Sequence, residues 1–100
     1  MVSPTRKIRW TKKSQRQRKE IFNYWNNRNK SKEFSKKLHR LFIKSLQPLK
    51  TNPELGVLNN ELDFRYLIVR HHLIFYNFNH TEIIVLKVWE AHQNPDNLKL

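Results

Sequence analysis

The residues of this chain whose types could do chemistry include histidine, lysine and arginine. The chain contains no cysteine. Five histidines raise the question of a metal site. His71 and His72 are adjacent, however, and adjacent residues on a strand point to opposite faces of the sheet. The lack of cysteine also excludes a thiolate site and a disulfide framework. We therefore expect neither a metal site nor any other cofactor.

The basic residues are concentrated in one half of the chain. Residues 1–50 hold sixteen Lys and Arg against Glu20 and Glu33, whereas residues 51–100 hold four against six acids. The formal net charge of the whole chain is +12. Such a charge distribution favours a polyanionic partner, either a nucleic acid or an acidic protein segment. The alternative is a merely solvated basic face, although a small domain needs far less net charge for solubility.

Two helices are predicted in the basic half, after a short strand at residues 7–10. Thr11 is a suitable N-cap for the first helix, whose inward stripe is Ser14, Arg18, Ile21, Phe22 and Trp25. Residues 26–30 break this pattern, and Ser31 is a suitable N-cap for the second helix. That helix has the strongest stripe, and Pro48 should kink or end it. Because the link is short, the two helices should form an antiparallel hairpin. The members of the second stripe are Phe34, Leu38, Leu41, Phe42, Ser45, Leu46 and Leu49.

The second half of the chain is predicted to be β-structure. Residues 52–56 should form a turn, in which Gly56, the only glycine, takes a positive φ. Continuous apolar runs at residues 64–70, 72–78 and 82–89 indicate a meander of three antiparallel strands. The predicted fold is therefore α+β, in which an N-terminal strand and a two-helix hairpin pack on an antiparallel β-sheet in the order β-α-α-β-β-β.

The length of the chain indicates one compact domain, residues 1–100. The longest apolar runs are too short for a transmembrane helix, and the basic N-terminus has no apolar segment behind it. We expect no membrane segment and no signal peptide, and the lack of cysteine is compatible with a reducing cytoplasm.

Six local sequences follow one another across nearly the whole chain: residues 8–11, Tyr24-Trp25 followed by Arg28, and residues 52–56, 65–69, 73–76 and 88–95. Taken in this order, they resemble toxins of the RelE/ParE superfamily. This resemblance implies the toxin of a bacterial type II toxin-antitoxin pair, held inactive by a cognate antitoxin. The superfamily has two main branches: RelE-like members cut messenger RNA on the ribosome, and ParE-like members poison DNA gyrase.

The resemblance to RelE-like ribonucleases assigns three candidate catalytic residues. Such an enzyme needs a base, an acid and cations for the charge that builds on phosphorus. Arg65 matches the strand arginine that binds phosphate in these enzymes, and its guanidinium can donate two hydrogen bonds. His92 stands where the family often has an arginine and would act as general acid or base. Lys87 is expected from its strand position to face the same way as Val85 and Trp89 and to add a phosphate-binding cation.

Each of these assignments has a structural alternative. Arg65 could instead form a salt bridge to Asp63 or Glu90 that stabilises the sheet. His92 could be a partly exposed structural histidine, and Lys87 could be merely solvated. The hypothesis of a ribonuclease site requires Arg65 to face an open hollow between the helices and the sheet. Tyr76 is expected to pack in the sheet with its hydroxyl hydrogen-bonded.

Two departures from the RelE-like pattern favour the other branch. The loop at residues 51–62 has no Lys or Arg, and no tyrosine follows Tyr76. The long helical hairpin and the Pro53-x-x-Gly56 turn resemble ParE. We interpret the chain first as a ribosome-dependent messenger RNA endoribonuclease, because the basic half and Arg65 suit an RNA substrate. The alternatives are a ParE-like DNA gyrase inhibitor and a non-catalytic nucleic-acid-binding module.

The remaining candidates are cations that would bind partners. Nucleic acid is expected to contact Arg70, Lys12, Lys13 and Lys50. An acidic antitoxin segment is expected to lie in the groove between the helical hairpin and the sheet, where it would contact Arg16, Lys19, Lys37 and Arg40.

Overall fold

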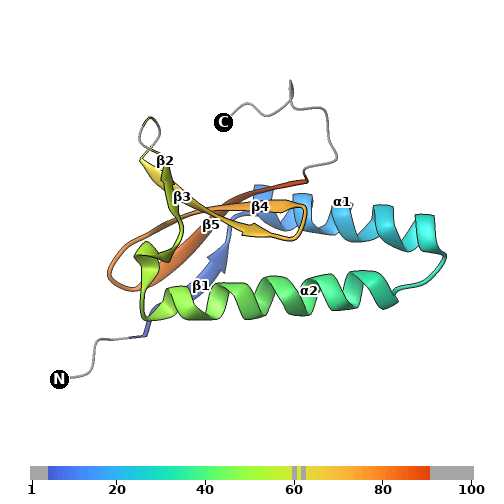
Figure 1. The fold of residues 1–100 in the computed structure, drawn as a ribbon, viewed down its shortest axis with the longest axis horizontal. Coiled ribbons are helices and arrows are strands. Elements are labelled where there is room, and N and C mark those ends of the chain that lie inside the picture. The colour runs from blue at the N-terminus through green and yellow to red at the C-terminus, as the bar shows by residue number, and fades with distance from the viewer. Residues whose placement is uncertain (1–4, 60, 62, 91–100) are drawn as a thin grey trace.

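The computed structural model describes residues 5–59, 61 and 63–90. Two antiparallel helices lie beside a five-stranded sheet, as Figure 1 shows. The strand order is β1-β5-β4-β3-β2, with β1 parallel to β5 and the other neighbours antiparallel. The elements are β1 (Lys7–Trp10), α1 (Lys12–Asn29), α2 (Glu33–Leu46), the 3-10 turns η1 (Gln47–Lys50) and η2 (Pro53–Leu55), β2 (Val57–Asn59), β3 (Phe64–Val69), β4 (His72–Phe78) and β5 (Glu82–Glu90).

The predicted α+β fold is confirmed, but the sheet is larger than a three-stranded meander. The strand β1 pairs in parallel with β5, from Lys7 beside Glu82 to Trp10 beside Val85. The short strand β2 adds a second edge, with Val57 beside Tyr66. The strand at residues 7–10 was predicted, but its pairing with β5 was not. The strand β2 was not predicted, because three residues are too few for a periodic pattern to detect.

The first helix begins at its predicted cap and ends later than predicted. Thr11 Oγ1 accepts a hydrogen bond from the backbone N–H of Ser14 at 3.1 Å, as an N-cap does. The helix then continues to Asn29, beyond the expected break at residue 26. No glycine or proline lies between residues 26 and 29, so nothing there forces an end. Lys30, with a φ of 51°, terminates the helix in the left-handed conformation.

The second helix follows its predicted stripe closely. Its N-cap, however, is Lys32 and not the predicted Ser31, and no side chain caps it. Ser31 Oγ still accepts a hydrogen bond from the N–H of Glu33 at 3.1 Å. Leu38, Phe42, Leu46 and Leu49 are all buried. Pro48 ends the α-helix, and the chain continues as the 3-10 turn η1, which still buries Leu49.

The core lies between the helical hairpin and one face of the sheet. Ile74 and Tyr76 of β4 and Ile83 and Val85 of β5 are fully buried there, against Phe42 of α2. This burial supplies most of the driving force for docking the hairpin, at roughly 25 cal/mol per Å² of apolar surface.

The helix α1 replaces a strand along part of β5. Because β1 ends at Trp10, the edge of β5 beyond Val85 has no neighbouring strand on that side. Thr11 Oγ1 donates to the carbonyl of Leu86 at 3.3 Å, and Gln17 Oε1 accepts from the N–H of Val88 at 2.9 Å. These side chains satisfy backbone groups that would otherwise lack a partner.

The predicted positive φ of Gly56 is wrong. Its φ is −71° and its ψ is 163°, an extended conformation that any residue adopts. Glycine is needed there for space, because a Cβ atom would meet the side chain of Tyr76 and the backbone carbonyl of Tyr66. The lack of a side chain at Gly56 thus lets the 52–56 turn pack directly against β3 and β4 of the sheet.

Within the described part of the chain, neither helix is long and apolar enough to cross a lipid bilayer.

Candidate functional site

Arg65 stabilises the turn that precedes β2. Its Nη1 donates to the carbonyl of Gly56 at 2.9 Å and to that of Glu54 at 3.2 Å. The guanidinium is half-buried on the same face of the sheet as Tyr76, its neighbour on β4. The ion pairs found among the described residues do not include the alternative salt bridge from Arg65 to Asp63 or Glu90. Part of the donor capacity expected to bind phosphate is therefore used on backbone carbonyls.

Tyr76 completes this arrangement from β4. Its hydroxyl donates to the carbonyl of Pro53 at 2.7 Å and accepts from the N–H of Gly56 at 2.8 Å. Burial raises the pKa of Tyr76, while the Gly56 N–H and the charge of Arg65 oppose that shift. The hydroxyl therefore stays protonated at neutral pH. The prediction that Tyr76 packs in the sheet with a hydrogen-bonded hydroxyl is confirmed.

Lys87 lies on the opposite face of the sheet from Arg65. A register shift between Phe75 and Tyr76 leaves Leu86 as an extra residue, so that Tyr76 pairs with Val85 and Phe75 pairs with Lys87. Lys87 therefore shares a face with Phe75 and with Trp89, which pairs with Leu73. The prediction that Lys87 faces the same way as Val85 and Trp89 is right for Trp89 and wrong for Val85. Burial, and next the charge of Lys13, lower the pKa of Lys87. The structure thus brings Lys87 close to Lys13 and not to Arg65.

His92 lies outside the described residues, so its assignment as general acid or base stays a prediction. Arg65 and Lys87, the two described members of the predicted catalytic set, do not converge on one site.

A buried polar cluster at the end of β5 was missed by the sequence analysis. His72 and Glu90 are both buried, with His72 Nε2 at 3.9 Å from Glu90 Oε1. Trp25 Nε1 donates to the same carboxylate oxygen at 3.2 Å, and the ring of Phe42 packs edge-on against His72 at 5.3 Å. The cluster joins α1, α2, β4 and β5, so we interpret it as structural. A charged Glu90 that follows an apolar run was the only signal for it in the sequence.

Cations gather around two surface hollows, one on each side of α2. We call the first the α2 groove; it holds about 430 Å³ and lies between α2 and the β3–β4 turn. We call the second the α1 hollow; it holds about 660 Å³ and is lined by residues of α1 and by His39 of α2. The α2 groove is lined by Phe34, Lys37, Leu38, Arg40, Leu41, Lys44 and Arg70. The α1 hollow is lined by Lys12, Gln15, Arg16, Arg18, Lys19, Phe22, Asn23 and His39.

These hollows separate residues that the sequence analysis had grouped. Of the antitoxin candidates, Lys37 and Arg40 line the α2 groove, whereas Arg16 and Lys19 line the α1 hollow. Of the nucleic-acid candidates, Arg70 lines the α2 groove and Lys12 the α1 hollow, while Lys13 lies near Lys87. Lys50 lines neither hollow, and its backbone carbonyl accepts from the N–H of Arg6 at 3.2 Å. Arg65 also lines neither of these two hollows.

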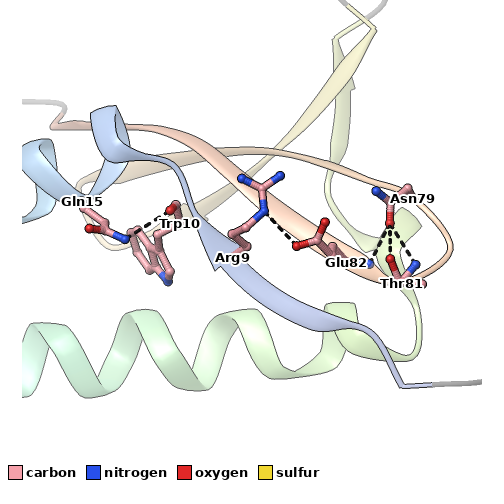
Figure 2. A network of polar contacts seen from close by, with 6 residues as sticks. All are labelled: Arg9, Trp10, Gln15, Asn79, Thr81 and Glu82. Atoms are coloured by element: carbon pink, nitrogen blue, oxygen red, sulfur yellow. Dashed lines mark hydrogen bonds and ion pairs between the residues drawn. The ribbon is translucent and has the colours of Figure 1, made fainter.

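A polar network at the junction of β1 and β5 positions the start of α1 (Figure 2). Gln15 Nε2 donates to the carbonyl of Trp10 at 3.2 Å, which ties the first turn of α1 to the end of β1. Arg9 Nε donates to Glu82 Oε2 at 2.8 Å, so the charge of Arg9 is compensated. In the β4–β5 turn, Asn79 Oδ1 accepts from the N–H groups of Thr81 and Glu82 at 2.9 and 2.8 Å.

A basic helical hairpin on one face of a mostly antiparallel sheet is the architecture of the RelE/ParE toxins. The solved structure titled "Chromosomal ParDE TA system from P. aeruginosa" matches this fold with a TM-score of 0.71 at 15% sequence identity. The match covers 88% of this chain and 98% of that one. In sequence, residues 8–95 match the family described as the ParE toxin of the type II toxin-antitoxin system parDE. The chain therefore belongs to the ParE toxin family.

A second solved structure resembles this chain only weakly. The structure of TrmO from Pseudomonas aeruginosa matches 89% of this chain and 37% of that one, at 13% identity with a TM-score of 0.48. No curated protein matches the chain in sequence.

Proposed function

We propose that this toxin acts as an inhibitor of DNA gyrase and not as a messenger RNA endoribonuclease. ParE-type members usually inhibit gyrase, and the family match spans residues 8–95. The observation that carries the proposal is the position of Arg65 and Lys87 on opposite faces of the sheet. A ribonuclease needs its base, acid and cations within hydrogen-bond reach of one phosphodiester.

The contacts of Arg65 support the same proposal. Its Nη1 is bound to two carbonyls of the 52–56 turn, and the described part of the loop that follows offers no Lys or Arg as a substitute. The role of Arg65 is then structural, because it stabilises the turn that directly precedes β2. In an oxyanion-type role, by contrast, a guanidinium must keep its donors directed at the developing charge.

The test is the toxicity of an Arg65→Ala variant. We expect the free energy of unfolding to fall by about 1–3 kcal/mol, because two carbonyls lose a charged donor. Growth arrest per folded molecule should nevertheless stay within a factor of about three of the parent, far from the roughly 10²-fold loss that removing a transition-state donor causes. Toxicity is scored in a bacterium at matched levels of folded protein.

Two further measurements on the parent toxin separate the functions. Trapped gyrase-DNA breaks and loss of plasmid supercoiling are expected after induction. Primer extension that reveals cuts inside codons of messenger RNA, without gyrase damage, would overturn the proposal in favour of the ribonuclease. A loss of cleavage in Arg65→Ala would then identify Arg65 as catalytic.

For inhibition by the antitoxin, we propose that an acidic amphipathic segment lies in the α2 groove. The floor of this groove is apolar, with Leu38 buried between the half-buried Phe34 and Leu41. Its rim carries the exposed cations Lys37, Arg40, Lys44 and Arg70. Apolar side chains on one side of a helix and carboxylates at its edges would complement this surface.

Arg70 offers a substitution that separates stability from binding. It has a φ of 55° at the start of the two-residue turn between β3 and β4. A left-handed backbone costs an L-residue about 1–2 kcal/mol, which glycine avoids, although glycine loses about 0.5–1 kcal/mol more in chain entropy. We expect Arg70→Gly to unfold at slightly higher urea concentration and to bind the cognate antitoxin about tenfold more weakly. Arg70→Lys, which keeps the charge, is the matched control and should bind normally. Unchanged binding by Arg70→Gly would remove Arg70 from the docking surface.

A further inference from the structure

The α1 hollow presents three cations in one line along a rigid helix. Lys12, Arg16 and Lys19 are exposed and separated by four and three residues. At 100° and 1.5 Å per residue they lie within about 60° of arc and extend over about 10 Å of the helix axis. One strand of a nucleic-acid duplex carries a phosphate about every 3.4 Å along its axis. The line is long enough to follow about three successive phosphates.

Lys12, Arg16 and Lys19 take part in no ion pair found among the described residues. No carboxylate lines the hollow, and the ion pairs found among the described residues use Arg9 and His72. A fourth cation, Arg18, lies over the ring of Trp10 at 4.1 Å from its centroid. Gln15 holds this end of α1 against β1, so the cations are presented on a fixed surface.

The aromatic side chains near the hollow are already engaged. Arg18 covers a face of the Trp10 ring. The ring of Phe22 stacks on that of Phe42, with 6.1 Å between the ring centroids. The ring of His39 packs edge-on against that of Phe22, with 5.8 Å between the centroids. Single-stranded nucleic acids are bound largely by stacking of splayed bases on exposed aromatic rings. The hollow therefore suits the backbone of a duplex better than unstacked bases.

An acidic helical peptide fits this surface less well than it fits the α2 groove. Phe22 is the only aliphatic or aromatic hydrocarbon side chain among the described residues that line the α1 hollow, and it is partly buried by its ring contacts. An amphipathic partner would find no continuous apolar floor there. Phosphates require only donors and positive charge.

We propose that the α1 hollow binds the phosphate backbone of duplex DNA through Lys12, Arg16 and Lys19. This reassigns Arg16 and Lys19 from the antitoxin to DNA. Because the contacts are to phosphates, binding has no sequence preference and is strongly salt-dependent. The inference is independent of the gyrase proposal, since it concerns the toxin and DNA alone.

The test measures binding of the purified toxin to a short fluorescent duplex by anisotropy, between about 50 and 200 mM salt. Each lost phosphate contact should reduce the slope of log K against log salt by about 0.9, so K12Q/R16Q/K19Q should reduce it by about 2.7. The matched control K37Q/R40Q/K44Q removes the same charge from the α2 groove and should leave the slope unchanged. The charge-keeping variant K12R/R16K/K19R should bind like the parent. Circular dichroism checks that each variant is folded.

Five results would overturn the proposal, the last of which applies only if K12Q/R16Q/K19Q does not fold. Equal losses in the two glutamine variants would mean that only net charge matters, and an unchanged slope in K12Q/R16Q/K19Q would exclude the hollow. Tighter binding of single-stranded RNA than of the duplex would show that the hollow binds single-stranded RNA and not duplex DNA. Displacement of the duplex by a poly-glutamate peptide at lower concentration than by unlabelled DNA would assign the hollow to an acidic protein. If K12Q/R16Q/K19Q does not fold, loss of binding by the charge-keeping variant decides against the proposal, and normal binding supports it.

Discussion

Phe42→Ala is expected to lower the free energy of unfolding by about 3–5 kcal/mol, the usual cost of removing a buried phenyl ring. Phe42 is fully buried. Its ring stacks on Phe22 of α1 and meets His72 of β4 edge-on, so it connects both helices to the sheet. The loss is measured by urea denaturation of the purified toxin.

Such a loss should have a functional consequence. Domains of this size are stable by only about 5–15 kcal/mol, so the variant should be largely depleted in cells and lose its toxicity. Tyr24→Ala is the matched control, because Tyr24 is a half-exposed aromatic residue on the outside of α1. We expect it to change stability by less than about 0.5 kcal/mol. Similar losses in both variants would contradict the placement of the core between the hairpin and the sheet.

Gly56→Ala is expected to lower the free energy of unfolding by about 1–3 kcal/mol, although its backbone conformation suits alanine. An added Cβ would lie 2.6 Å from Cε1 of Tyr76 and 2.9 Å from the carbonyl oxygen of Tyr66. The carbonyl belongs to the strand β3, which pairs with β2 at Val57, so it cannot move without breaking that pairing. In open space the same change would raise stability by about 0.4–1 kcal/mol, so the sign of the effect tests the close approach.

A neighbouring position provides the comparison for Gly56. Leu55 is 54% exposed, and Leu55→Ala should have little effect on the urea midpoint.

A double substitution tests the contact between Gly56 and Tyr76 directly. Adding Tyr76→Phe to Gly56→Ala removes the hydroxyl that the new Cβ would meet, together with the two hydrogen bonds that this hydroxyl makes. The two substitutions should therefore be non-additive, as expected for residues in contact. A Gly56→Ala protein that is as stable as the parent would contradict the contact with Tyr76.

The local pattern predicted the elements but not the edges of the sheet. The stripe from Leu38 to Leu49 and the cap at Thr11 depend on neighbours within a few residues, and both were predicted correctly. The parallel pairing of β1 with β5 joins Lys7 to Glu82, far apart in the chain. A four-residue strand carries no information about which distant strand it will join.

In the candidate site, too, some features follow from the sequence and others only from the tertiary structure. The sequence by itself determined a basic helical hairpin, an α+β fold and the presence of Arg65 on a strand, because charge and periodicity are local properties. The tertiary structure alone decided that one extra residue at Leu86 puts Lys87 on the face opposite Arg65, and that Arg65 binds the 52–56 turn. It also divided the helical cations between two hollows on either side of α2. These outcomes depend on which distant segments pack together, since a side chain's face and partners are set by long-range register and not by its neighbours in sequence.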